Sequence, residues 1–188
     1  MIKIKGLFLQ VVGFGVSLLP VGAGVAVAQV PPCQVSRIAG GGSFPLNELG
    51  YRESRPAREV SFSPPTVLDV DRDGNLYFSF SRGPDHMDHL YRISTDGQVS
   101  NFMDLDGGAT ALTIDPGNNL YVAVDFNRSG RTPRSAIIRV SPDGSQTLVA
   151  GNGLGPPPGT EPMPALEANI DTYIVGLAAG PSGDLFFG

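Results

Sequence analysis

Apolar and polar residues alternate along several short segments of this chain. Leu, Val, Ile or Phe occupies every second position of residues 68–70, 76–80, 112–114 and 120–124. A period of two predicts β-strands with one face more buried than the other. No segment beyond the N-terminal region keeps the 3.6-residue period of a helix. The pattern therefore predicts an all-β protein.

Short turns rich in Gly, Asn and Asp separate the predicted strands. One kind of turn is Asp73-Gly74-Asn75 or Gly117-Asn118-Asn119, and the other is Asp96-Gly97 or Asp143-Gly144. These residue types accept positive φ, so each turn closes two strands into a tight hairpin. Two successive hairpins predict a four-stranded antiparallel sheet.

The two-hairpin unit repeats along the chain. Residues 67–104 and 111–150 each carry one unit, with equivalent positions 44 or 47 residues apart, and residues 176–188 begin a third. A period in the forties is typical of propeller blades. One sheet alone cannot bury both faces, whereas blades stacked around an axis bury them. We therefore predict a β-propeller of four-stranded antiparallel blades, with two nearly whole blades and partial ones in this chain.

The repeats also share particular residues. The shared pattern is best seen as Ala-Leu-Thr-Ile-Asp at 111–115, Asn-Leu-Tyr-Val-Ala at 119–123, Asp125 and Ile-Arg-Val at 138–140. This pattern resembles the NHL-repeat family, over roughly residues 36–188. The chain departs from it at Ser81, which stands where the next repeat has Asp125, and in a long insertion at 126–135.

The resemblance implies a six-bladed ring, of which this sequence covers only part. We therefore expect the chain to belong to a longer reading frame. We expect residues 36–66 to supply strands that complete a blade elsewhere in the ring.

The N-terminus has the features of a secretory signal peptide. Lys3 and Lys5 precede an apolar stretch at 7–19, and small residues precede a predicted cleavage point after residue 28. The alternative is an uncleaved membrane anchor, which the proline and glycines after the apolar stretch disfavour. We predict a signal peptide at 1–28, a secreted or periplasmic domain at 29–188, and no stable membrane span once the signal is cleaved.

Composition narrows the function classes. The net charge is −5; of the 13 basic residues Lys3 and Lys5 lie in the predicted signal, so 11 Arg face 18 acidic residues in the remainder, which carries −7. An acidic body without a basic cluster argues against nucleic acid as a partner. Cys33 is the only cysteine, so the chain has no internal disulfide, and the role of its thiol stays open.

The blade topology divides the connections between two ends of the ring. The short hairpin turns lie at one end, and the long or polar connections at 81–88, 106–109, 126–135 and 151–171 lie at the other. Binding sites on repeat scaffolds usually lie on the variable loops, and we expect a protein, peptide or carbohydrate ligand there. The candidate ligand-binding residues are Asp125, Asn127, Arg128, Arg131 and Arg134.

One cluster has the composition of a metal site. Asp85, His86, Asp88 and His89 place two imidazoles three residues apart between carboxylates, a combination that could bind zinc. Ordinary surface polarity is the favoured interpretation. The aspartates around the first turn lack the glutamate of a calcium-binding loop, so turn formation is favoured over calcium there.

The sequence leaves two functions open. The absence of a coherent catalytic set favours a binding or scaffold module that acts through the long connections. The alternative is a metal-dependent propeller enzyme using zinc or calcium. The family resemblance implies a peptide-amidating type of lyase or a gluconolactonase-like hydrolase, with its site completed by blades outside this sequence.

Overall fold

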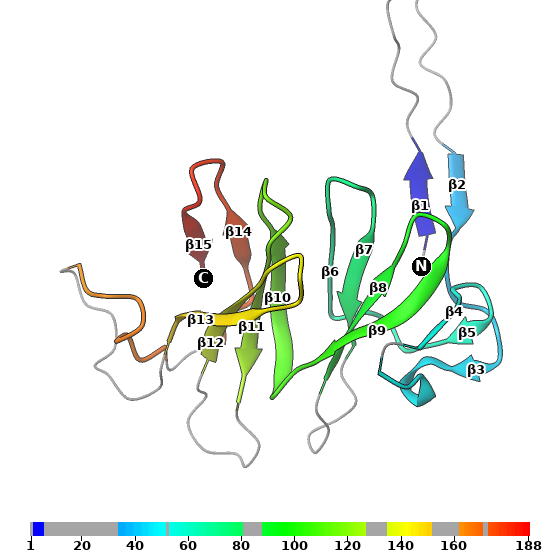
Figure 1. Cartoon of the computed structure of the whole chain (residues 1–188), viewed down its shortest axis with the longest axis horizontal. Coiled ribbons are helices and arrows are strands. Elements are labelled where there is room, and N and C mark those ends of the chain that lie inside the picture. Colours follow the sequence, from blue (N-terminus) through cyan, green and yellow to red (C-terminus); the bar gives the residue numbers. More distant parts are fainter. Residues whose placement is uncertain are drawn as a thin grey trace, which may run out of the picture.

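The protein is built of β-sheets stacked face to face (Figure 1). The structure, a computed structural model, describes residues 2–5, 34–51, 53–80, 88–126, 135–151, 162–170 and 173–188. No helix among these residues is long and apolar enough to cross a membrane. The structure confirms an all-β protein with the blade topology of a β-propeller.

The first sheet has five strands in the order β4-β9-β8-β7-β6. Its strands are β4 (Ser54–Pro56), β6 (Val67–Val70), β7 (Leu76–Ser79), β8 (His89–Ile93) and β9 (Gln98–Asp104). Strands β6 to β9 form the predicted antiparallel blade. The prediction of four strands is incomplete here, because β4 adds an antiparallel fifth strand to the edge of β9.

The second sheet is the predicted four-stranded antiparallel blade. It runs in sequence order through β10 (Gly108–Ile114), β11 (Leu120–Asp125), β12 (Ser135–Val140) and β13 (Gln146–Ala150). Strand β10 begins at Gly108, so part of the predicted loop 106–109 belongs to the sheet. A buried Ala109 at the start of this strand explains the extension.

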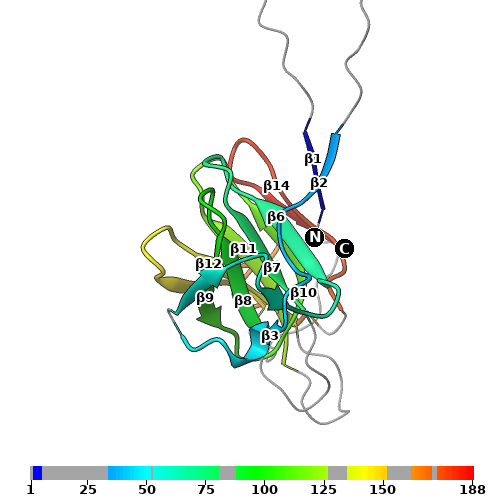
Figure 2. The same cartoon turned by 90° about the vertical axis from the view of Figure 1, so that its right-hand side faces the viewer.

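Four shorter pieces complete the described structure. They are the antiparallel pair β14 (Leu177–Ala179) and β15 (Leu185–Phe187), the antiparallel pair β1 (Ile2–Lys5) and β2 (Gln34–Arg37), the parallel pair β3 (Phe44–Pro45) and β5 (Val60–Ser61), and the 3₁₀ helix η1 (Leu46–Glu48). The β14–β15 pair is the third repeat that the sequence predicts. Figure 2 looks along the stack, and the edge strands of the first sheet are β6 and β4.

Three apolar cores lie between successive layers. One lies between residues 39–60 and the first sheet, one between the two large sheets, and one between the second sheet and residues 162–185. Strands β7 and β11 are consequently buried on both faces. The sequence predicts that one face of each strand is more buried than the other. This prediction is wrong for β7 and β11, because another layer covers each side of both sheets.

Residues 39–60 form a cover on the first sheet, and we call them the cap. Leu46, Ala57 and Val60 of the cap are fully buried against Phe78 and its neighbours. In the described part of the chain the apolar side chains of the cap cover one face of the first sheet, and β4 extends its edge. That residues 36–66 complete a blade elsewhere in the ring stays a prediction.

The hairpin turns lie together at one end of the stack, which we call the turn end (Figure 1). Gly74 and Asn118 adopt the predicted positive φ, at 86° and 61°. In the first sheet both oxygens of Asp71 accept hydrogen bonds from Asn75, at 2.7 and 2.8 Å. Asp115 and Asn119 repeat these bonds in the second sheet, at 2.9 and 2.8 Å. The interpretation of these aspartates as turn-forming residues is confirmed.

Three side-chain contacts join the sheets at the turn end. The Asp69 carboxylate accepts a hydrogen bond from the Ile114 amide at 3.0 Å. The Asn118 side chain donates to Asp73 at 3.0 Å and accepts from the Arg72 amide at 3.2 Å. These bonds fix the register of one sheet against the next. Sequence reasoning did not anticipate them, because they join residues 45 or 46 positions apart.

We expect Asp115→Ala to lower the free energy of unfolding at neutral pH by about 1–2 kcal/mol, because it leaves several turn donors without an acceptor. Desolvation raises the pKa of Asp115, but hydrogen bonds from Asn119, Gly117 and Tyr121 outweigh it and lower the pKa overall. This stabilisation is complete above the unfolded-state pKa of about 3.9 and is lost as the pH falls through the folded-state value.

Urea unfolding of wild type and Asp115→Ala between pH 2 and 7 measures the effect. The difference between the two proteins should shrink once the pH falls below about 4. Asp143 lies in an exposed turn, where its carboxylate accepts a hydrogen bond from the Ser145 amide. Asp143→Ala should therefore lower the free energy of unfolding by less than Asp115→Ala does. A constant difference across this pH range would contradict the assignment.

Candidate functional site

The strand ends that border the long connections lie at the end opposite the hairpin turns, which we call the loop end (Figure 1). The connection between β9 and β10 and the facing ends of β11 and β12 lie there. For the described strand ends and the β9–β10 connection, this distribution agrees with the predicted division between two ends. It places the described candidate residues Asp88, His89 and Asp125 at the loop end.

Asp88 anchors the connection between the two sheets. Its side chain is buried, and its Oδ2 accepts a hydrogen bond from the Ala109 amide at 3.0 Å. Its backbone carbonyl accepts another from the Leu105 amide at 2.9 Å. The interpretation of this cluster as surface polarity is therefore wrong for Asp88, whose carboxylate satisfies a buried amide at the start of β10.

His89 begins β8 and is held by a carboxylate. Its Nδ1 lies 2.5 Å from Oδ1 of Asp104, across the β8–β9 pair. The Asn101 side chain donates to the same oxygen at 3.3 Å, and the Tyr91 ring packs edge-on against the imidazole. These contacts orient the imidazole at the loop end. The sequence did not identify Asp104 as its partner, because the pairing depends on strand register.

Asp125 ends β11 at a point where two backbones approach closely. It pairs with Gly108 of β10 and Ser135 of β12. A Cβ at Gly107 would lie 2.3 Å from the Asp125 carbonyl oxygen and 2.8 Å from a methyl group of Val124. The glycine at 107 is thus required by contact with β11, which positions Asp125 at the loop end.

The remaining candidates lie outside the described residues. They are Asp85, His86, Asn127, Arg128, Arg131 and Arg134. The part of the chain that the structure describes brings no three His, Cys, Asp or Glu side chains together in a metal-binding arrangement. The zinc and ligand-binding assignments of these residues stay predictions.

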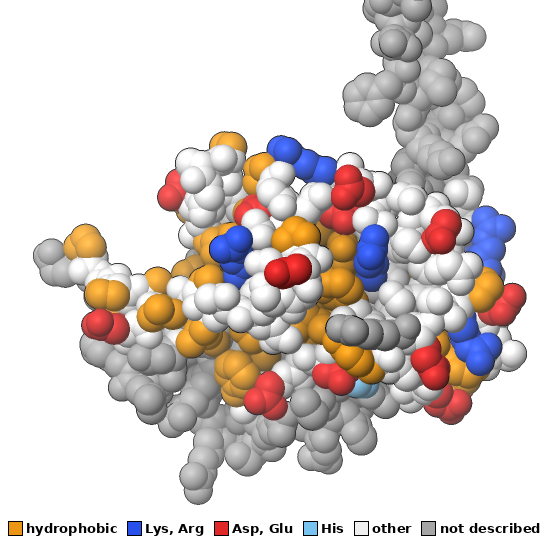
Figure 3. Space-filling view, in the orientation of Figure 1, with side chains coloured by type: hydrophobic (Ala, Val, Ile, Leu, Met, Phe, Trp, Pro, Cys, Tyr) orange, Lys and Arg blue, Asp and Glu red, His pale blue; other side chains and the backbone are white. Residues whose placement is uncertain are grey.

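Two of the pockets in the described part of the chain lie between packed elements and away from the loop end. One of about 300 Å³ lies between β9 and the β12–β13 hairpin, and its lining includes Phe102, Met103 and Val140. Figure 3 shows hydrophobic side chains gathered between the two large sheets on this side of the molecule. The pocket therefore opens directly onto the apolar contact between the sheets.

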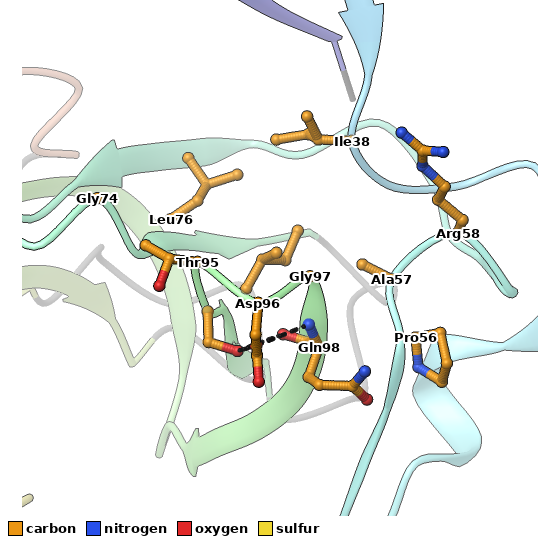
Figure 4. A pocket seen from close by; sticks show the side chains of 12 residues that line it. Ile38, Pro56, Ala57, Arg58, Gly74, Leu76, Thr95, Asp96, Gly97 and Gln98 are labelled. Carbon is orange, nitrogen blue, oxygen red and sulfur yellow. Dashed lines mark hydrogen bonds between the residues drawn. The ribbon is translucent and has the colours of Figure 1, made fainter.

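The other pocket has a volume of about 380 Å³ and lies between the cap and the turn end of the first sheet (Figure 4). Its lining comes from residue 38, residues 56–58, Gly74, Leu76 and residues 93–98. No local motif marks such a site, since the cap and two hairpin turns assemble it. Sequence reasoning therefore missed it.

Comparisons with known proteins give a distant structural likeness. No protein-family model and no curated protein matches the chain. Among solved structures the chain is similar to virginiamycin B lyase from Staphylococcus aureus, with 19% sequence identity and a TM-score of 0.39. The match covers 65% of this chain and 33% of the lyase chain, so this chain spans about a third of that protein's length.

Proposed function

We propose that this chain is an exported NHL-type β-propeller segment that binds a protein, peptide or carbohydrate ligand through its loop end. The signal-like features of residues 1–28 support export, and the residues shared between repeats support the NHL assignment. Nucleic acid is not a partner in this proposal, because the chain is acidic and lacks a basic cluster.

The observation that carries the proposal is the difference between the two ends. At the turn end, Asp71 and Asp115 are engaged in closing their own turns. At the loop end, Asp88 and the close approach at Gly107 hold the strand ends in place. A rigid frame that carries long polar connections is the usual setting for binding.

The three arginines of the connection at 126–135 are the residues we expect to recognise the ligand. Guanidinium groups form forked hydrogen bonds with carboxylate, sulfate or phosphate groups. This preference favours acidic peptides and acidic glycans among the proposed ligand classes. Asp125 and Asn127 would add acceptors and donors beside them.

Screening the purified chain on peptide and glycan arrays tests the proposal. The triple variant Arg128→Ala, Arg131→Ala, Arg134→Ala should weaken the binding of any acidic hit at least about tenfold. The control variant, with Ala at Arg37, Arg55 and Arg72, removes the same charge elsewhere and should bind normally. Equal binding by both variants would contradict the proposal.

Metal analysis of the same preparation distinguishes the alternative function. A binding module should carry no stoichiometric metal and should bind its ligand equally with and without a chelator. One equivalent of zinc or calcium that disappears in His86→Ala would contradict a pure binding role. That result would support a metal-dependent enzyme.

A further inference from the structure

The pocket between the cap and the first sheet combines an apolar floor with a charged rim. Leu76 and Ile93 of the sheet and Ala57 of the cap are buried at its floor. Arg58 and Asp96 are exposed at its rim and come from the two opposite walls, the cap and the β8–β9 turn (Figure 4). Such a combination suits a small ligand with an apolar body and charges of both signs.

The Asp96 carboxylate is held in place by its own turn. Its Oδ1 accepts hydrogen bonds from the Ser94 hydroxyl and from the Gln98 amide, the latter at 3.2 Å. These bonds lower the pKa of Asp96, so the carboxylate stays charged across the physiological range. A fixed negative charge at the rim favours an ammonium group in the ligand.

Arg58 supplies the opposite charge. Within the part of the chain that the structure describes, its guanidinium forms no ion pair with a carboxylate. A guanidinium that is not neutralised locally can bind a ligand carboxylate through two parallel hydrogen bonds. The Gln98 carboxamide lies between Asp96 and Pro56 in Figure 4 and offers one donor and one acceptor group, which match a peptide bond.

We propose that this pocket binds a short apolar peptide with free ends, with its ammonium at Asp96, its carboxylate at Arg58 and its aliphatic side chains on Leu76 and Ile93. The volume of about 380 Å³ lies in the range of small-ligand sites and suits a dipeptide. The pocket lies at the turn end, so the inference does not depend on ligand binding at the loop end.

Titration of the ¹⁵N-labelled full chain with the dipeptide Leu-Leu, followed by NMR, tests the inference. Saturable shifts should be centred on the amides of residues 57–58 and 96–98. The dissociation constant should be on the order of 0.1–1 mM, as expected for a ligand of this size. N-acetyl-Leu-Leu-amide, which lacks both charges, should bind at least about tenfold more weakly.

Two variants and a matched control complete the test. Asp96→Asn keeps the acceptor for the turn bonds but removes the charge, and Arg58→Gln removes the guanidinium; each should weaken Leu-Leu binding at least about fivefold. Asp143→Asn makes the same change in the equivalent turn of the second sheet and should leave binding unchanged. Absence of saturable shifts up to about 10 mM, shifts centred elsewhere, or equal binding by all variants would overturn the inference.

Discussion

Replacing Phe78 with Ala should lower the free energy of unfolding by about 3–5 kcal/mol or abolish the cooperative unfolding transition altogether. Phe78 lies on β7 and is fully buried between the first sheet and the cap. Its ring centroid lies 5.3 Å from that of Phe62 and 5.6 Å from that of Tyr91. The substitution removes this ring and leaves a cavity that the surrounding aromatic side chains cannot fill.

Leu68→Ala provides a matched control for this experiment. Leu68 is the cross-strand partner of Phe78 in the β6–β7 pair, yet 54% of its surface is exposed. Leu68→Ala should lower the free energy of unfolding by less than about 1 kcal/mol. Urea unfolding followed by circular dichroism compares the two variants. If both substitutions lower the free energy of unfolding by the same amount, the cap does not cover Phe78 in solution. The pocket proposed between the cap and the first sheet would then lack its apolar floor.

The same pair of residues shows how far the apolar pattern predicts this fold. Alternation along 68–70 and 76–80 correctly places Leu68 and Phe78 in neighbouring antiparallel strands. It also predicts that both are buried, which is wrong for Leu68. The exposure depends on which segment covers the sheet, and the cap packs on β7, β8 and β9 through Phe78, Tyr91 and Val99. Local periodicity carries no information about that choice.

Turn chemistry was the more informative local signal. Positive φ is confirmed at Gly74, Asn118, Gly97 and Gly144, each of which the sequence places in a hairpin turn. These turns define the blade repeat because glycine and asparagine accept a backbone conformation that other residues resist. The repeat in turn correctly predicts the strand order of the second sheet.

Long-range contacts determine the features that the sequence did not predict. The β4 strand pairs with β9 across more than forty residues, as Ser54 does with Ser100. The β8–β9 register brings His89 into contact with Asp104, and the connection to the next sheet brings the Ala109 amide within hydrogen-bond distance of Asp88. The dipeptide pocket likewise requires the cap to pack against a turn. None of these partners has a fixed sequence spacing from which it could be inferred.

Glycine at 107 is one long-range requirement that can be tested directly at the loop end. A Cβ there would lie 2.3 Å from the Asp125 carbonyl oxygen, which is backbone and cannot rotate away. At Gly108 the nearest atom to an added Cβ would be Oδ2 of Asp88 at 3.8 Å, an ordinary contact. Two adjacent glycines therefore differ sharply in what they tolerate.

We expect Gly107→Ala to destabilise the protein by about 2–4 kcal/mol, since β10 and β11 must separate to admit the methyl group. Gly108→Ala, in the extended strand beside it, should cost under about 1 kcal/mol. Urea unfolding gives both values, and amide hydrogen exchange should show the loss of protection in Gly107→Ala concentrated at the end of β11. The same separation of β10 and β11 should weaken the binding of any ligand beside Asp125. Equal stability of the two variants would show that this contact does not hold the loop end together.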